Sequence, residues 1–253
     1  MSRRRRRPVP ALRGQGQTGT PTPPSSLAQR RRRHLLVVVL TFVTGSADAT
    51  GFLALGGAFS SVMTGNIVLL GLSAGTATAA LAITSGSAIG SYIVGVLIGA
   101  HVAGTPKPED PTWPRPVTRA LTLELGAIVC FLIIWELTLT DRTHQAQLGM
   151  LVIAAMALGI QSSAVQRFGV PGLSSTYLTG TLTVLIGGVA GRRPLPELLP
   201  STQVLGALVT GAGVGALVVH HLPWLSPLLL LLPLLAVLIA ARPLESTHPP
   251  SPT

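Results

Sequence analysis

The stretch 59–71, FSSVMTGNIVLLG, decides how the rest of this chain can fold. It is apolar enough to lie in a membrane, yet its centre reads Thr-Gly-Asn at 64–66. A related stretch, SSTYLTGTLTVLIG, occupies 174–187, and its Thr-Gly pair follows the first one by 115 residues. A polar, glycine-containing interruption that occurs once in each half of a hydrophobic chain indicates the site of a membrane transporter or channel.

The composition supports a membrane location. Of the 253 residues, 47% are hydrophobic and only 10% are charged, and the mean hydropathy is +0.57. Soluble domains contain about 25% charged residues. The 28 glycines suit close helix packing in lipid. The single cysteine, Cys130, excludes a disulfide within the chain and a cysteine-based metal site.

The net charge of +10 is concentrated at the N-terminus, because ten of the 18 Lys and Arg residues fall within the first 33 positions. A basic tail can bind nucleic acid. Here, however, Arg30 to Arg33 directly precede the first apolar run, as in segments that stay in the cytoplasm and touch anionic lipids. We therefore expect a multi-pass protein of the cell membrane with a cytoplasmic N-terminus, anionic lipids as partners, and no specific nucleic-acid partner.

The apolar segments predict an all-α, polytopic membrane protein with six to eight transmembrane helices. We expect a disordered, Arg-rich tail at 1–33, a single membrane domain at 34–241 and a disordered tail at 242–253. Within the domain we expect repeat 1 at about 34–104, a linking loop and span at 105–139, repeat 2 at about 147–221, and a final span at 224–241.

Glycine spacing indicates the internal repeat. Gly45 and Gly159 lie 114 residues apart. A set of three glycines recurs with identical spacing 116 residues later: Gly90, Gly95 and Gly99 return as Gly206, Gly211 and Gly215. An ordered set of matches at a nearly constant offset predicts two copies of one structural unit. The same glycines predict close contacts between helices.

Two topologies are compatible with these segments. If all eight segments cross, Lys and Arg outside the N-terminal tail divide into four on each side. If the two Thr-Gly segments are re-entrant, seven lie inside, and Arg142 alone lies outside. The second division fits the positive-inside bias and makes the two repeats inverted, so we favour it. The length of the Thr-Gly segments, which is sufficient to span, supports the first topology.

Two acids lie within apolar runs. Asp48 is about fourteen residues into the first span, where an ionisable side chain indicates either function or a structural role beside free backbone groups. Arg167 is its expected charge partner, and Gln161 its expected counterpart in the second repeat. Glu124 is about five residues into its span, so we expect it to reach the interface, with a coupling role as the alternative.

The residues Gly-Ser-Ala-Asp-Ala at 45–49, followed by Phe-Ser-Ser-Val-Met-Thr-Gly-Asn at 59–66, resemble the signature of the YoaK family of small bacterial multi-pass membrane proteins, a domain of unknown function. Gly-Ile-Gln at 159–161 and Thr-Tyr-Leu-Thr-Gly-Thr at 176–181 match its second half, although Ser162 replaces the family's usual Asn. The resemblance covers about 35–222. It implies a multi-pass membrane protein and no settled activity.

We expect a small transporter, permease or channel for an unidentified small solute or ion, because backbone groups and short polar side chains at such breaks can replace a solute's hydration shell. The residues expected to bind the solute are Asp48, Thr64, Gly65, Asn66, Gln161, Thr179, Gly180 and Thr181. The alternative is a non-transporting scaffold or accessory subunit, in which the Thr-Gly pairs serve helix packing. The chain could also form a homo-oligomer through its glycine-rich segments.

An integral membrane enzyme is the third alternative, and the sequence argues against it. All six histidines fall at the ends of segments or in tails, and no His/Glu pair has the spacing of metal ligands. The chain contains no phosphate-binding loop. We therefore expect no catalytic residues, no metal and no cofactor.

Overall fold

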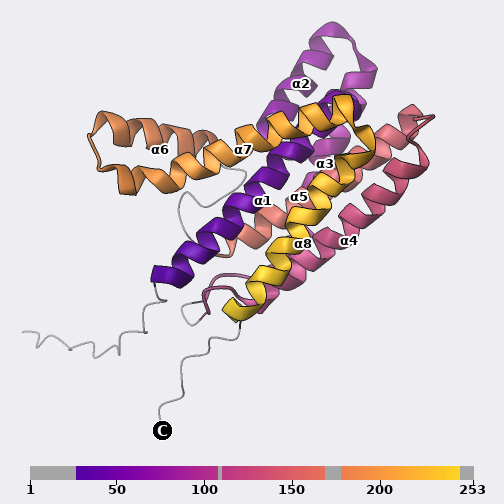
Figure 1. Ribbon diagram of the computed structural model, residues 1–253. Coiled ribbons are helices and arrows are strands. Elements are labelled where there is room, and N and C mark those ends of the chain that lie inside the picture. The colour runs from indigo at the N-terminus through magenta and orange to yellow at the C-terminus, as the bar shows by residue number, and fades with distance from the viewer. Residues whose placement is uncertain (1–26, 108–109, 169–177, 246–253) are drawn as a thin grey trace, which may run out of the picture.

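A computed structural model describes residues 27–107, 110–168 and 178–245, and these ranges form eight α-helices and one 3-10 turn (Figure 1). The all-α, polytopic architecture is confirmed. The elements are α1 (Leu27–Ala54), α2 (Met63–Thr76), α3 (Ala79–Ala103), α4 (Arg115–Leu137), α5 (His144–Gln166), α6 (Leu178–Ala190), α7 (Leu195–His221), η1 (Pro223–Leu225) and α8 (Ser226–Glu245).

Six of these helices are long and apolar enough to cross a membrane, namely α1, α3, α4, α5, α7 and η1–α8 taken together. The Thr-Gly helices α2 and α6 have only 14 and 13 residues. A helix of that length extends about 20 Å, against a hydrocarbon core of about 30 Å. The described structure therefore favours the topology in which the two Thr-Gly segments do not cross.

The first helix begins earlier than expected. It starts at Leu27, so Arg30 to Arg33 form helical turns that continue directly into the apolar part of α1. Arginine is a good helix former, and no Gly or Pro interrupts the chain between 27 and 44. Likewise α8 continues to Glu245, beyond the expected start of the tail at 242. The expectations for 1–26, 169–177 and 246–253 lie outside the described residues.

Contacts between side chains near the helix termini show which termini lie at the same end of the bundle. The Arg33 guanidinium stacks on the Phe168 ring just after α5, 5.3 Å from its centroid, and Thr118 near the start of α4 donates a hydrogen bond to Glu245 at the end of α8. We call this end of the bundle, which also holds the loop residues 104–107 and 110–114, the basic end. At the opposite end, the indole N–H of Trp135 donates to the Pro223 carbonyl at 2.8 Å.

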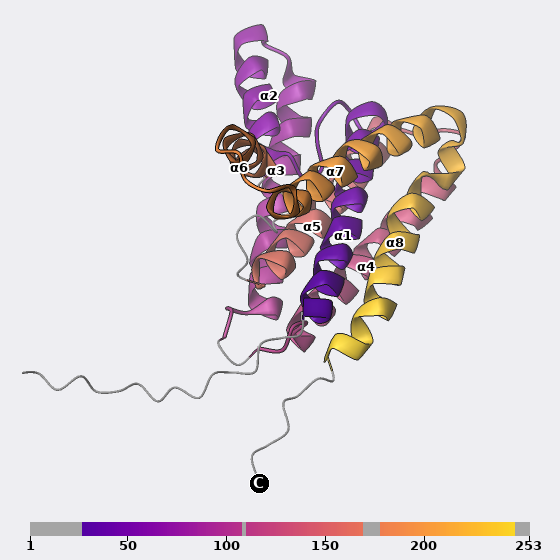
Figure 2. The same ribbon diagram turned by 60° about the vertical axis from the view of Figure 1, so that its left-hand side comes forward.

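The first helix of each repeat packs in parallel against the third helix of the other repeat. On α1 and α7, Phe42 lies against Gly211 and Ser46 against Gly215. Residue numbers rise together along both helices, so α1 and α7 run in the same direction (Figure 1, Figure 2).

The second pair repeats this arrangement. On α3 and α5, Gly95 lies against Met156 and Gly99 against Ile160, again with numbers rising together. These contacts match those of α1 and α7 at the repeat offsets of 114 and 116 residues. Since α1 and α5 run in opposite directions between the two ends of the bundle, the two repeats are inverted with respect to each other and interlocked through these pairs.

Burial follows the same symmetry. All twelve buried residues of α1 have a buried counterpart in α5 exactly 114 positions later. The helices that follow α1–α3 and α5–α7, namely α4 and α8, are also equivalent. Helix α4 packs on α5 as α8 packs on α1, and α4 and α8 pack on each other. Each repeat therefore contains four helices, one more than the sequence indicates.

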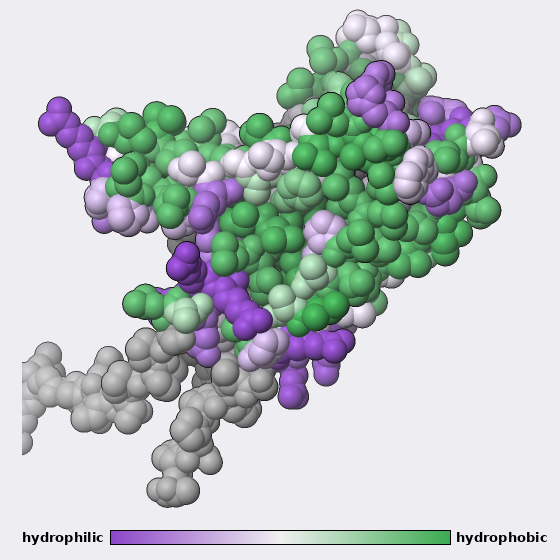
Figure 3. Space-filling model, viewed as in Figure 1, coloured by the Kyte–Doolittle hydropathy of each residue, from purple (hydrophilic) through white to green (hydrophobic). Residues whose placement is uncertain are grey.

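The surface agrees with a lipid environment. Figure 3 shows apolar residues over most of the visible face of the bundle, with hydrophilic residues gathered towards the helix ends. Large apolar side chains are exposed on α2 and α6 as well, including Ile67, Val68, Val184 and Ile186. In water such a surface would associate, whereas in a bilayer it is solvated by acyl chains.

Candidate functional site

Asp48 holds the first break in place. The Asp48 carboxylate accepts a hydrogen bond from the Ser61 backbone N–H to Oδ1 at 2.7 Å, and one from the Ser61 hydroxyl to Oδ2 at 2.5 Å. Asp48 is 6% exposed and lies in α1 six residues before its end. After α1 the chain therefore turns back along the helix before α2 begins. The carboxylate satisfies a backbone donor that would otherwise be buried without a partner.

Asn66 in α2 fixes the same break through hydrogen bonds with the loop that precedes the helix. Its Oδ1 accepts from the Phe59 N–H at 2.9 Å, and its Nδ2 donates to the Phe59 carbonyl at 2.7 Å. Both ends of the amide are thus bound to one residue of the returning loop. The turn itself uses Gly56 and Gly57, whose φ angles of +102° and +79° are accessible to glycine at little cost.

The other residues of the first motif lie at the start of α2. Thr64 is exposed in its first turn. A methyl group at Gly65 would come within 3.2 Å of the Phe59 ring, so the glycine allows that ring to pack closely over the turn. The motif thus combines a buried anchoring face with an exposed hydroxyl.

The second break is described from Leu178 onward. Thr179 is exposed, and Thr181 is 2% exposed, in the first turn of α6. The buried residues of α2 are Asn66 and Ser73, and those of α6 are Thr181 and Gly188, the same positions 115 residues later. The structure therefore places the two Thr-Gly turns in equivalent positions. The residues 174–177 of the second motif lie outside the described residues.

Gln161 joins the two repeats where α1 crosses α5. Its Nε2 donates to Thr44 Oγ1 at 2.8 Å and to the Leu40 carbonyl at 3.4 Å. Its Oε1 is buried and has no hydrogen-bond partner among the described residues. Asp48 lies one turn beyond Thr44. The burial pattern makes Ser162 the counterpart of Asp48, which corrects the expectation that Gln161 fills that position.

Arg167 does not pair with Asp48, so that expectation is wrong. Its Nη2 donates to both oxygens of the Asp110 carboxylate, at 2.9 and 3.0 Å, and its Nη1 donates to the Ala103 carbonyl. These groups lie at the basic end, where the ends of α3 and α5 meet the loop residues 104–107 and 110–114. Sequence reasoning missed the pairing because Asp110 is in the proline-rich loop and carries no periodic signal.

Glu124 is the buried acid whose position the sequence did not predict. It is 0% exposed on the packed face of α4, and neither carboxyl oxygen has a hydrogen-bond partner among the described residues. It does not reach the interface as expected, because it shares a helix face with Val117, Leu121 and Ile128. The helical spacing of Glu124 with these apolar residues was the sequence signal that could have predicted its burial. Burying a carboxyl group without a partner costs free energy, so Glu124 is a candidate for a functional role.

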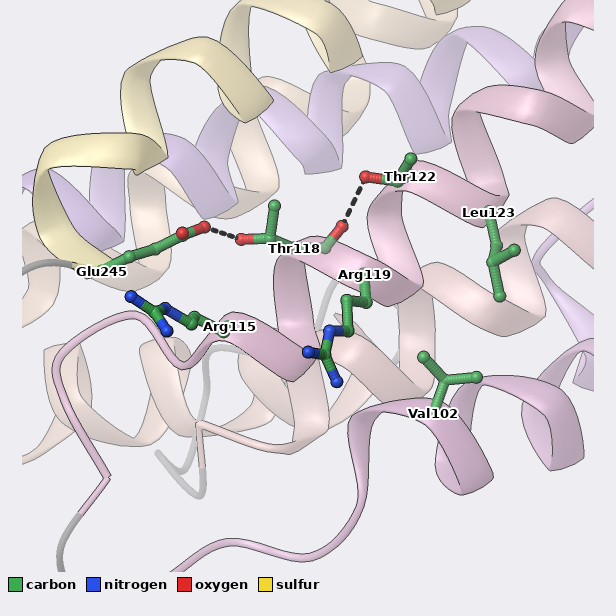
Figure 4. A pocket seen from close by; sticks show the side chains of 7 residues that line it. All are labelled: Val102, Arg115, Thr118, Arg119, Thr122, Leu123 and Glu245. Carbon is green, nitrogen blue, oxygen red and sulfur yellow. Dashed lines mark hydrogen bonds between the residues drawn. The ribbon is translucent and has the colours of Figure 1, made fainter.

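Two grooves lined by described residues lie away from these breaks. One, of about 420 Å³, is at the basic end beside α3, α4 and α8 (Figure 4). The other, of about 400 Å³, runs between α1 and α7 near Phe42 and Gln203. Within the described part of the chain, no three His, Cys, Asp or Glu side chains are placed to hold a metal ion.

Two inverted and interlocked repeats, each with a short helix packed beside a long one, define a polytopic α-helical membrane protein. The chain belongs to the family described as "Protein of unknown function (DUF1275)", whose model matches residues 36–241. The resemblance noted from the sequence motifs is thereby confirmed.

One relative bears the name of the family that the sequence motifs resemble. The chain is 35% identical over 159 residues to the "UPF0700 transmembrane protein YoaK" of Bacillus subtilis (strain 168), an alignment that covers 63% of this chain and 68% of the relative. No solved structure matches the chain. The comparisons support a multi-pass membrane protein.

Proposed function

We propose that this protein is a small transporter or channel, and that a small solute or ion passes where α2 and α6 begin. The observation that carries the proposal is the inverted, interlocked arrangement of α1 with α7 and α3 with α5. Each inverted repeat contributes one short helix, and α2 packs on α3 as α6 packs on α7. Paired broken segments in inverted repeats are a recurrent plan for alternating access around a central site.

The candidate residues divide by role in this proposal. Thr64 and Thr179 contact the solute, because their side chains are exposed in the first turns of α2 and α6. Asp48 and Asn66 are positioning residues that hold the first break. Gly65 and Gly180 lie beside these threonines, and the buried Gln161 and Thr181 are further positioning residues. Glu124 is the candidate for a coupling proton or cation, since its oxygens have no partner among the described residues.

We further propose that the protein lies in the cell membrane with the basic end in the cytoplasm. The basic end carries Arg30 to Arg33, Lys107, Arg115, Arg119 and Arg167, and the opposite end carries Arg142. This asymmetry follows the positive-inside bias. The Arg-rich N-terminus is then placed to touch the anionic lipids of the inner leaflet.

Thiol labelling of intact cells tests this orientation. In a Cys130→Ser background, a cysteine replacing Lys107 is expected to resist an impermeant thiol reagent until cells are opened, whereas one replacing Arg142 is expected to react at once. The reason is that the two positions lie at opposite ends of the bundle. Labelling of position 107 from outside, with protection of position 142, would reverse the orientation. Labelling of both from outside would refute the six-span topology.

Solute flux tests the site. In proteoliposomes we would screen swelling in isosmotic potassium chloride, sodium acetate, ammonium chloride and glycerol. The double variant Thr64→Val/Thr179→Val is expected to reduce the observed flux about tenfold at unchanged thermal stability. It replaces two solute-facing hydroxyls with methyl groups, and the volumes of the side chains hardly change. If Glu124 couples a proton, a pH gradient drives flux in the parent protein and not in Glu124→Gln.

The matched control is Thr76→Val/Thr183→Val, which removes exposed hydroxyls farther along the same two helices. Equal loss of flux in both double variants would contradict a site at the first turns. One observation favours a scaffold or accessory subunit as the second candidate, namely that Asp48 and Asn66 are already hydrogen-bonded within the break. Flux no greater than in empty liposomes across the panel would favour that alternative.

A further inference from the structure

The groove at the basic end has the polarity of a phospholipid. It lies between Val102 near the end of α3, the first two turns of α4, and Glu245 at the end of α8, and has a volume of about 420 Å³. Figure 4 shows Arg115 and Arg119 on the side nearer the helix ends, with Leu123 and Val102 facing each other farther along α4. Thr118 and Thr122 complete the lining. The groove thus passes from cationic to apolar over about two turns of α4.

The two arginines are available to a ligand. They are four residues apart, so they project from the same side of α4. Both are exposed, and neither forms an ion pair or hydrogen bond with any residue in the described ranges. Their planar guanidinium groups suit two-pronged binding of a phosphate group. By contrast, Arg167 at the same end of the bundle forms an ion pair with Asp110. Lack of an ion pair is therefore not shared by all arginines at this end.

Glu245 is the acid that lines the groove, and it limits the positive charge. One of its oxygens accepts a hydrogen bond from the Thr118 hydroxyl. With two arginines and one carboxylate, the formal charge of the lining is +1. A ligand with a single negative charge therefore matches the groove better than a highly charged anion.

The apolar part of the groove identifies the rest of the ligand. Leu123 and Val102 form its apolar wall. A free phosphate would leave this wall unused, whereas an acyl chain would cover it. The arginines stand at the start of the membrane-spanning helix α4, where lipid headgroups lie.

We propose that this groove binds one anionic phospholipid, with its phosphate on Arg115 and Arg119 and an acyl chain along Leu123 and Val102. Basic pockets between transmembrane helices are known to hold anionic headgroups. This site is separate from the Arg-rich N-terminus and does not depend on the proposed transport activity. It would fix the ends of α3, α4 and α8 relative to one another.

Native mass spectrometry of the full-length protein in neutral detergent tests the site, since it resolves individual bound lipids. Phosphatidylglycerol is the probe, and phosphatidylcholine with the same acyl chains is its neutral counterpart. We expect one phosphatidylglycerol to bind at least tenfold more tightly than phosphatidylcholine. The variant Arg115→Gln/Arg119→Gln is expected to lower this affinity about tenfold, because each arginine near a lipid surface contributes substantially to anionic-lipid binding.

The matched control is Arg192→Gln/Arg193→Gln, which removes the same charge from exposed positions outside the groove. It is expected to change the first binding step less than twofold. An equal loss in both double variants would overturn the proposal in favour of attraction by net charge. Displacement of the lipid by millimolar inorganic phosphate, or equal binding of phosphatidylcholine, would also overturn it. Thermal unfolding of each variant without lipid confirms that the fold is retained.

Discussion

Replacing Gly95 with alanine will lower the thermal unfolding temperature by about 5–10 °C, and Gly211→Ala will do the same. A methyl group at Gly95 would lie 2.0 Å from the Met156 carbonyl oxygen, and one at Gly211 would lie 2.2 Å from the Phe42 carbonyl oxygen. Backbone atoms cannot rotate aside as a side chain can, so the helices must separate. Helix association within a membrane depends on this close packing, because lipid already solvates apolar surface.

Gly90→Ala and Gly206→Ala are the matched controls in the same two helices. An added methyl group there meets no described atom within 4 Å, and alanine favours a helix over glycine by about 1 kcal/mol. These variants should therefore be as stable as the parent protein or slightly more stable. Thermal unfolding in detergent, followed by the loss of monodisperse protein, measures all four. Similar behaviour of Gly95→Ala and Gly90→Ala would contradict the interlocked packing of α3 with α5.

The second large effect is expected at Asp48. Asp48→Ala removes the acceptor of two buried hydrogen bonds from Ser61 and leaves both donors without a partner. Each unsatisfied donor costs about 1–3 kcal/mol, so we expect a total loss of about 2–6 kcal/mol. The loop 55–62 should then leave α1, and the start of α2 should become more accessible. A cysteine at position 64 in a Cys130→Ser background should react several-fold faster with a thiol reagent.

Graded variants separate this anchoring role from a general effect of lost charge. Asp48→Asn retains an oxygen acceptor for the Ser61 N–H and should be less harmful than Asp48→Ala. Ser61→Ala removes one of the two donors and should be intermediate. Asp141→Ala, which removes an exposed carboxylate, should have no effect. An Asp48→Ala protein with unchanged stability and unchanged labelling at position 64 would show that Asp48 does not hold the break.

Much of the membrane architecture could be predicted because its signals are local. Long apolar runs reveal spanning helices, since a bilayer of about 30 Å requires about 20 apolar residues. The repeat was visible because close helix contacts at Gly95, Gly99, Gly211 and Gly215 require small residues at fixed spacing. From the sequence, the Thr-Gly segments could either cross the membrane or re-enter it. Hydropathy left both alternatives open, because it does not report where a helix begins.

The partners of individual polar groups could not be predicted. Arg167 was expected to pair with Asp48, but it pairs with Asp110, and the amide of Asn66 binds Phe59. Such pairings depend on where loops return after leaving a helix, and no periodicity in the sequence encodes that path. Glu124 lies on the packed face of α4 by periodicity, yet its lack of a partner depends on what the neighbouring helices place around it.

The sequence by itself determined the membrane class, the two repeats and the two polar breaks, because hydrophobic length and glycine spacing act within one helix at a time. Only the tertiary structure decided that α1 packs on α7 and α3 on α5, which interlocks the two inverted repeats that the distribution of Lys and Arg already favoured. A Gly-x-x-x-Gly face specifies how closely a helix can be approached and leaves its partner unspecified. The partner is set by the three-dimensional arrangement of all eight helices, in which each buried polar break must find its hydrogen bonds.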